Sequence, residues 1–176
     1  TITMDLTCAL TEAVGANGID AGEFTTTLAK ISDYYARLLE KPFAFMTLPE
    51  TKFQFGEMLS LADKAAAMNI KNLVILGIGG SSLGTQTIFD ALLHPLHNME
   101  ERFRNGRPRY FILDNIDPHK MAAIVETIVP DMDRTFLVVI SKSGETPETI
   151  SQFMLFNELM RKSAGYQQRI VLITDK

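Results

Sequence analysis

Four short, mainly apolar runs separated by stretches of helical spacing constrain the fold of this chain more than any other feature. The runs are Leu73–Leu76, Tyr110–Leu113, Phe136–Ile140 and Arg169–Ile173. They lack the apolar/polar alternation of a sheet with one face in water, so both of their faces are expected to be covered. Strands of this kind that alternate with helices predict a parallel sheet. We therefore expect an α/β fold with a doubly wound parallel sheet of the common strand order 2-1-3-4-5.

The segments between these runs carry helix signals. Apolar residues have helical spacing over Ser82–Leu93, and Asp117 with Pro118 opens a second helix. Pro147 suits the first position of a third helix that runs to about Lys162. We expect the methionines on helical faces to pack in the core, namely Met58, Met121, Met154 and Met160.

Residues 1–69 are expected to form a helical segment ahead of the sheet. Asp20 followed by Glu23 three positions later resembles a capping box, and the apolar residues from Phe24 to Leu38 follow helical spacing. A second helix is expected from Glu50 to about Met68. We predict that residues 1–69 pack on the sheet and that residues 70–176 form the sheet domain.

Composition argues against several classes of function. The formal net charge of −4 is unlike that of a general nucleic-acid binder, which normally has a basic face. The single cysteine, Cys8, allows neither an internal disulfide nor a cysteine-based metal site, which fits a reducing cytoplasm. No run approaches the roughly 18 apolar residues of a membrane span, so we expect no membrane partner. Thr1 and Lys176 are expected to be boundaries of a piece of a longer chain.

The most informative loop is the hydroxyl-rich stretch Ser141–Thr149, which follows the third apolar run. It reads Ser-Lys-Ser-Gly-Glu-Thr-Pro-Glu-Thr. A strand that feeds such a loop at the start of a helix is suited to bind phosphate, because the first helical N–H groups lack intrahelical partners and the helix dipole adds positive charge. Ser141, Ser143 and Thr146 add hydroxyl donors, and Lys142 adds a full charge. Thr146 also suits the N-cap of the helix.

A second loop of the same kind follows the first apolar run. It is Gly77–Thr85, in which closely spaced glycines let the backbone approach a ligand while Ser81 and Ser82 can cap the next helix. Doubly wound sheets bind ligands at the carboxyl ends of strands where the strand order reverses. In the expected order that reversal lies between the first and third strands, so both loops should face one crevice.

Nucleotide sites are the main competing interpretation of the glycine-rich loop. Ser82 stands where the dinucleotide fingerprint has its third glycine, and the next strand-ending acid, Asp114, lies farther on than the expected ~20 residues. The P-loop pattern fails as well, because Thr85 follows Gly84 with no lysine between them. The spacing therefore disfavours both nucleotide motifs.

The two loops together resemble a known family. Ser141–Thr146 is similar to the phosphate loop of sugar isomerase (SIS) domains. With Gly77-Ile-Gly-Gly-Ser81 it resembles the N-terminal SIS domain of the bacterial-type glucose-6-phosphate isomerase family. Asp114–Pro118 and Ile173–Asp175 fit this pattern too, and the resemblance covers about residues 69–176. It implies that the fifth strand of the 2-1-3-4-5 sheet is missing from this chain.

The resemblance implies a role for each matching residue. The sugar phosphate would lie on Ser141, Ser143 and Thr146 with Lys142 lining the site, and Gly80 and Ser81 would line the same crevice. Glu148 matches a family glutamate that helps to orient a catalytic histidine, although an acid in the first turn also complements the helix dipole. The residues themselves leave both roles of Glu148 open.

The resemblance also implies a reaction, the interconversion of glucose 6-phosphate and fructose 6-phosphate in glycolysis and gluconeogenesis. A carboxylate base would move a proton between C2 and C1, and no metal or organic cofactor is expected. The family's base glutamate, ring-opening histidine and C-terminal lysine would fall beyond Lys176, so we expect this chain alone to be inactive. The three histidines here, His94, His97 and His119, are expected to be solvent-exposed.

Two alternatives stay open. The chain could be a stand-alone SIS module that binds a phosphosugar for regulation without turnover, or part of an isomerase of another sugar phosphate. Lys142 favours the glucose-phosphate branch, because related amino-sugar enzymes usually have glutamine at that position. The family typically forms homodimers, which we expect of the full-length protein in the cytoplasm.

Overall fold

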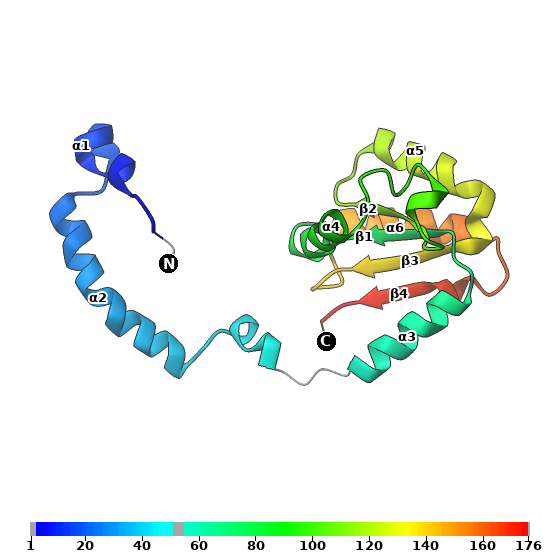
Figure 1. The fold of residues 1–176 in the computed structure, drawn as a ribbon, viewed down its shortest axis with the longest axis horizontal. Coiled ribbons are helices and arrows are strands. Elements are labelled where there is room, and N and C mark those ends of the chain that lie inside the picture. Colours follow the sequence, from blue (N-terminus) through cyan, green and yellow to red (C-terminus); the bar gives the residue numbers. More distant parts are fainter. Residues whose placement is uncertain (1–2, 51–54, 176) are drawn as a thin grey trace. The chain divides into compact units, whose positions relative to one another are not determined.

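The computed structural model describes residues 3–50 and 55–175. The chain divides into two compact units, Thr1–Gln54 and Phe55–Lys176, and each is described here by itself (Figure 1). The division expected from the sequence, between residues 69 and 70, and the packing of the first segment on the sheet stay predictions.

The first unit is helical. Its α-helices are α1 (Thr11–Val14) and α2 (Ala21–Glu40), and it also contains 3-10 helices at Thr7–Ala9, Gly15–Asn17, Ala44–Met46 and Leu48–Glu50. The Asp20 side chain caps α2 by accepting a hydrogen bond from the Glu23 N–H at 2.9 Å, so the predicted helix start is confirmed. No residue of this unit whose side chain the structure describes is buried.

The second unit alternates strands and helices. Its α-helices are α3 (Phe55–Ala67), α4 (Gly80–Leu92), α5 (Pro118–Ile128) and α6 (Pro147–Met160). Its strands are β1 (Asn72–Leu76), β2 (Arg109–Leu113), β3 (Thr135–Ile140) and β4 (Ile170–Ile173), and 3-10 helices occur at Glu101–Phe103, Val129–Arg134 and Tyr166–Arg169. All four predicted strands are present, each displaced by at most one residue. Residues 51–54 of the helix expected from Glu50 lie outside the described residues.

The four strands form one parallel sheet of order β2-β1-β3-β4, and their arrows point the same way in Figure 1. The predicted α/β class and the order of the first four strands are therefore confirmed. The central strand β1 pairs Leu76 with Leu113 on one side and with Val139 on the other. The reversal of strand order consequently lies between β1 and β3, and the loops that follow these two strands leave the sheet side by side.

Helices cover the sheet on both faces. One face holds a core to which α5 contributes Ile124 and Ile128 and α6 contributes Phe156 and Met160. The buried strand residues of this core alternate along the strands, as the period of two requires, and include Val74, Leu76, Leu113, Leu137 and Val139. On the opposite face, Phe89 of α4 lies with its ring 4.2 Å from that of Tyr110.

Two expectations about exposure need correction. His94 and His119 are exposed as predicted. His97 is instead only 3% exposed, and its Nε2 lies 2.9 Å from the Pro108 carbonyl oxygen in the segment before β2. Met160 is buried and Met121 packs against the core, whereas Met58 and Met154 are 59% and 66% exposed. Helical spacing shows that residues share a face but not which face is covered.

Candidate functional site

The glycine-rich loop after β1 is fitted tightly against the end of β3. The Gly77 N–H donates to the Leu113 carbonyl at 3.2 Å. A Cβ atom at position 77 would lie 3.0 Å from the Ser81 Cβ and 3.2 Å from the Ile140 carbonyl oxygen. Those distances are tighter than ordinary Cβ contacts, so a side chain at position 77 would press this loop away from Ile140, the residue that precedes Ser141.

The two serines of this loop behave differently from each other. The Ser82 hydroxyl is buried and donates to the Gly79 carbonyl at 3.1 Å, inside the loop. The N-cap residue of α4 is Gly79 and no side chain caps this helix, so the predicted serine cap is wrong. Gly80 is exposed and Ser81 half-buried, which places these two predicted site residues at the open side of the loop.

The loop after β3 is held by its own hydroxyls. Ser141 Oγ and Thr146 Oγ1 lie 2.9 Å apart, and the Gly144 N–H donates to Ser141 Oγ at 3.1 Å. Gly144 has φ +71°, a conformation that glycine adopts without the Cβ penalty of other residues. The Ser143 hydroxyl accepts from the Glu145 N–H at 3.1 Å. Ser141, Ser143 and Thr146 are thus brought together in one turn.

One of the two hydroxyl protons of the Ser141–Thr146 pair is not used within the turn. Each hydroxyl carries one proton and can accept two hydrogen bonds. The contact between the two oxygens uses one of the two protons, and the Gly144 N–H uses only an acceptor site. One hydroxyl proton of the pair therefore remains to be donated to a ligand.

The start of α6 adds backbone donors to this turn. Thr146 occupies the N-cap position as predicted, but its hydroxyl bonds to Ser141 and makes no capping hydrogen bond. The first hydrogen bond of the helix runs from the Ile150 N–H to the Thr146 carbonyl at 2.9 Å. The N–H groups of Glu148 and Thr149 lie before it and therefore have no partner within the helix. These groups and the helix dipole make the turn electropositive. The Glu148 side chain is half-buried in this first turn.

The exposed side of the turn is an open surface. Lys142 and Ser143 are exposed, while Ser141 is buried at its base. A cavity of about 170 Å³ lies beside the turn, against β3, β4 and α6, and its lining is mainly apolar. Because that cavity is smaller than the usual ligand pockets of roughly 300–1,000 Å³, an anion would meet the exposed face of the turn and not the cavity.

Two contacts that anchor the site were not predicted. The Lys142 carbonyl accepts from the Asp175 N–H at 3.0 Å and from the Thr174 hydroxyl at 3.4 Å, which ties the turn to the end of β4. Gln152 of α6 is fully buried and its Nε2 donates to the Asn115 carbonyl at 2.7 Å, behind β2. A glutamine at helical spacing from Phe156, on the face of α6 that carries Phe156 and Met160, was the available signal for the second contact.

Charged side chains order the loop after β2. The Lys120 ammonium donates to the Asp114 carboxylate at 2.9 Å, and this hydrogen bond lowers the pKa of Asp114 below its ordinary value. The Asp117 side chain accepts from the N–H groups of His119 and Lys120 and caps α5. Asp114 is therefore engaged with a neighbouring lysine at the carboxyl edge of the sheet.

The described residues indicate neither a metal site nor a membrane-spanning helix. Across residues 3–50 and 55–175, no group of three or more histidine, cysteine or acidic side chains could hold a metal ion. In the same part of the chain, no helix combines the length and the apolar character needed to cross a bilayer.

Comparison with known proteins places this geometry in a family. The family model described as Phosphoglucose isomerase matches residues 51–173. A glucose-6-phosphate isomerase of Rubrobacter xylanophilus is 32% identical over 161 residues, covering 90% of this chain and 36% of that protein. One of Carboxydothermus hydrogenoformans is 39% identical over 108 residues, covering 60% and 23%. This chain thus spans about a third or less of these relatives' length.

Solved structures agree with the sequence relatives. A crystal structure of a glucose-6-phosphate isomerase from Chlamydia trachomatis matches with a TM-score of 0.52 and 31% identity, over 68% of this chain and 22% of that one. A hypothetical protein, TT0462 of Thermus thermophilus, shares the fold with a TM-score of 0.66 and 24% identity, over 88% of this chain and 37% of that one. With a family model that matches most of the chain, these findings show that the chain belongs to the phosphoglucose isomerase family.

Proposed function

We propose that the turn Ser141–Thr146 binds the phosphate of a sugar phosphate, and that the protein to which this chain belongs interconverts glucose 6-phosphate and fructose 6-phosphate. The observation that carries the proposal is the convergence of hydroxyls and free helical N–H groups in one turn at the switch point of the sheet. Membership of the phosphoglucose isomerase family supports the identity of the substrate.

Each residue of the turn has a distinct part in this proposal. Ser143 and the remaining proton of the Ser141–Thr146 pair donate hydrogen bonds to phosphate oxygens, and the Lys142 ammonium supplies a full positive charge. The N–H groups at the start of α6 complete the cradle, as helix N-termini commonly do for phosphate. Binding the phosphate holds the sugar in place and so positions its reacting carbons.

Residues around the turn would serve the sugar rather than its phosphate. Gly80 and Ser81, on the exposed side of the neighbouring loop, would line the sugar site, where the absence of a side chain at Gly80 lets the ligand approach the backbone. Glu148 would act as an accessory acid that orients a histidine from elsewhere in the full-length protein. The base that moves the proton between C2 and C1 is not assigned to any residue of this chain.

The proposal extends to the whole protein through its relatives. Because the chain spans about a third or less of their length, we expect it to bind the sugar phosphate without turning it over. We propose that the full-length protein works in the cytoplasm as a homodimer and needs neither metal nor organic cofactor. Nucleic acid and membranes are not among its proposed partners.

Titration of the isotopically labelled chain with fructose 6-phosphate tests the proposal by NMR. The amide signals of Ser143, Gly144 and Thr146 should move with a single binding curve. Ser143→Ala should weaken binding by at least about tenfold, the loss of one hydrogen bond to a charged group, and Lys142→Ala by at least as much. Unchanged amide signals at the turn throughout the titration would refute the phosphate site.

A matched serine provides the control. Ser151 lies one turn into α6, where its exposed hydroxyl donates to the Pro147 carbonyl at 2.7 Å. Ser151→Ala should leave the affinity for fructose 6-phosphate within about twofold, because this hydroxyl is already satisfied inside the helix. An equal loss in Ser143→Ala and Ser151→Ala would indicate damage to α6 and not loss of a ligand contact.

A further inference from the structure

We propose that this chain carries a second anion site, at the amino edge of the sheet, which takes a small molecule with two phosphoryl groups. The site is a cavity of about 400 Å³, within the usual size range of ligand pockets. We call it the basic pocket, after the five cationic side chains that line it, Lys71, Arg104, Arg107, Arg109 and Arg134.

The basic pocket lies at the end of the sheet opposite the phosphate turn. Lys71 immediately precedes β1, Arg109 begins β2 and Arg134 immediately precedes β3. The starts of three neighbouring strands therefore meet at the basic pocket. The turn Ser141–Thr146 follows the other end of β3. The two proposed sites are therefore separated by the length of the strands.

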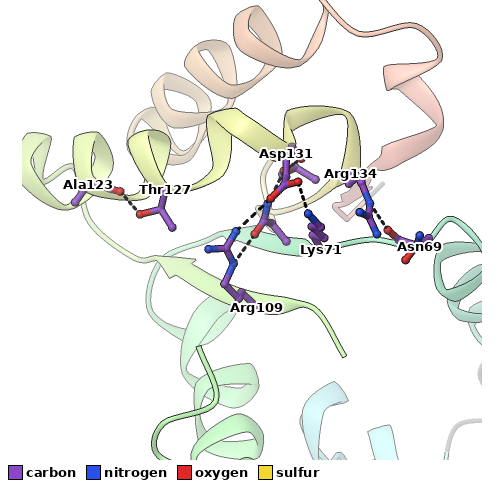
Figure 2. Close-up of polar contacts among 9 residues, drawn as sticks. Asn69, Lys71, Arg109, Ala123, Thr127, Asp131 and Arg134 are labelled. Atoms are coloured by element: carbon purple, nitrogen blue, oxygen red, sulfur yellow. Dashed lines mark hydrogen bonds and ion pairs between the residues drawn. The ribbon is translucent and has the colours of Figure 1, made fainter. Parts of the chain in front are cut away.

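Part of the positive charge is held in a rigid network. Figure 2 shows Lys71 and Arg109 converging on Asp131, with the Lys71 ammonium 2.7 Å and the Arg109 Nη2 3.8 Å from its carboxylate oxygens. The Arg109 Nε also donates to Asn72, a fully buried side chain that donates in turn to the Thr135 hydroxyl at 3.1 Å. These contacts fix the cations of the pocket floor and already neutralise Asp131.

The remaining arginines have unused donors. The Arg134 Nε donates to the Asn69 carbonyl at 3.0 Å, which leaves its terminal amino groups without a hydrogen-bond partner in the described part of the chain (Figure 2). No ion pair among the described residues involves Arg104 or Arg107. The second acid of the lining, Glu101, is exposed. Arg134 makes no ion pair among the described residues either, although its charge acts on Asp131 together with those of Lys71 and Arg109. In a chain with a net charge of −4, this excess of positive charge around one cavity favours an anionic ligand.

The chemistry of the lining indicates which anion fits. The unpaired guanidinium groups come from two separate segments, the loop that holds Arg104 and Arg107 and the end of the 3-10 helix that holds Arg134. Two groups of donors match two anionic groups on one ligand, and the planar fork of arginine suits phosphoryl oxygens. None of the described lining residues is aromatic, so there is no surface on which a nucleobase could stack. A small diphosphorylated molecule is the expected occupant.

Inorganic diphosphate is the probe for this site. The chain should bind it in calorimetry, more weakly as salt is added, because screening acts on exposed charges. NMR signals of Gly106, Arg107 and Arg134 should move. Binding should persist with saturating fructose 6-phosphate present, since that ligand is assigned to the other edge. Signal changes confined to Ser143 and Gly144, or complete displacement by fructose 6-phosphate, would overturn the proposal and leave the phosphate turn as the diphosphate site.

Variants test the two arginines of the loop. The double variant Arg104→Gln/Arg107→Gln should bind diphosphate at least tenfold more weakly, the equivalent of about one charge-assisted hydrogen bond. The control is Arg161→Gln, which removes an exposed arginine that pairs with Glu158 on α6 and should change affinity by less than twofold. Circular dichroism checks the fold of each variant. Should the double variant not fold, Arg107→Gln alone, at an exposed position, gives the same test with a smaller loss. Affinity equal to that of the unchanged chain in a folded variant would refute the basic pocket.

Discussion

The two edges of the parallel sheet are built by opposite means. At the carboxyl edge, the loops after β1 and β3 present backbone N–H groups and short hydroxyls, and Gly77 and Gly144 provide the backbone shape. At the amino edge, Lys71 before β1 and Arg109 at the start of β2 are held by ion pairs with Asp131. Each arrangement suits an anion, but the first depends on backbone conformation and the second on side-chain contacts over long sequence distances.

This difference teaches where each edge is sensitive to substitution. The carboxyl edge should tolerate changes of surface charge but not an added Cβ in its loops. The amino edge should tolerate backbone adjustment but not loss of the buried side chain that supports its arginine. The following variants test that contrast, from the largest expected effect to the smallest.

Gly77→Ala should lower the free energy of unfolding most, by about 3 kcal/mol, because the new Cβ would press on the Ser81 Cβ and the Ile140 carbonyl. Its control is Gly84→Ala on α4, where a Cβ would meet nothing within 4 Å and should add about 0.5–1 kcal/mol through helix propensity. Urea denaturation of both variants gives the comparison. If both variants changed the free energy of unfolding in the same direction, the loop after β1 would accommodate a Cβ at position 77, contrary to this prediction.

Asn72→Ala should cost about 2 kcal/mol, since it removes a fully buried amide that bonds both Arg109 and Thr135 and leaves those groups unsatisfied. The matched asparagine at the other edge is Asn115, whose exposed side chain makes no hydrogen bond among the described residues. Asn115→Ala should stay within about 0.5 kcal/mol of the unchanged chain. Thermal denaturation distinguishes the two variants. Equal melting temperatures would contradict the claim that the Asn72 side chain stabilises the fold.

Ser141→Ala should cost about 1 kcal/mol, the typical net worth of a buried hydrogen bond, because the Thr146 hydroxyl loses its partner, while the Gly144 N–H keeps its hydrogen bond to the Ser141 carbonyl at 3.2 Å. Ser141→Thr keeps the hydroxyl and serves as the conservative control. The loss should also broaden or shift the NMR signals of Gly144 and Thr146. If those signals stay in place in Ser141→Ala, the hydroxyl pair does not hold the turn.

Asp131→Asn should have the smallest effect, less than about 1 kcal/mol at neutral pH, because the ion pair with Lys71 is partly exposed. The hydrogen bond from Lys71 is the main cause that lowers the pKa of Asp131 below its ordinary value of 3.8. A lowered pKa means that the carboxylate stabilises the fold above 3.8 and that this contribution is lost as the pH falls through the folded-state pKa.

The measurement for Asp131→Asn is a series of denaturation curves from neutral to acidic pH. The gap in stability between the unchanged chain and the variant should close as the pH drops below 3.8. Asp133→Asn, two positions away at an exposed carboxylate with no ion pair among the described residues, is the control and should leave the stability at neutral pH within about 0.5 kcal/mol of the unchanged chain. A gap that persists in strong acid would point to packing and not to charge.

Much of the carboxyl edge was predictable because its signals are local. Pro147 after Thr146 marked a helix start, and the structure confirms it. The continuous apolar runs correctly marked the strands, but burial on both faces holds for the central strands β1 and β3 and not for β4, where Leu172 and Ile173 are exposed. The loops could be located from these boundaries alone. The partner of the Thr146 hydroxyl could not, because an N-cap residue and a hydroxyl that braces Ser141 look the same in the sequence.

The sequence alone located the strands, the helix starts and the two loops, since apolar runs and capping residues are signals carried by neighbouring residues; the strand order was expected from the common doubly wound topology, and the structure confirms it for the first four strands. Only the tertiary structure decided that His97 is buried against Pro108, that Met154 is exposed, and that Lys71, Arg109 and Asp131 meet. Those outcomes depend on contacts between residues that lie in different elements, 11 positions apart for His97 and Pro108 and 60 for Lys71 and Asp131, and local patterns carry no information about that proximity.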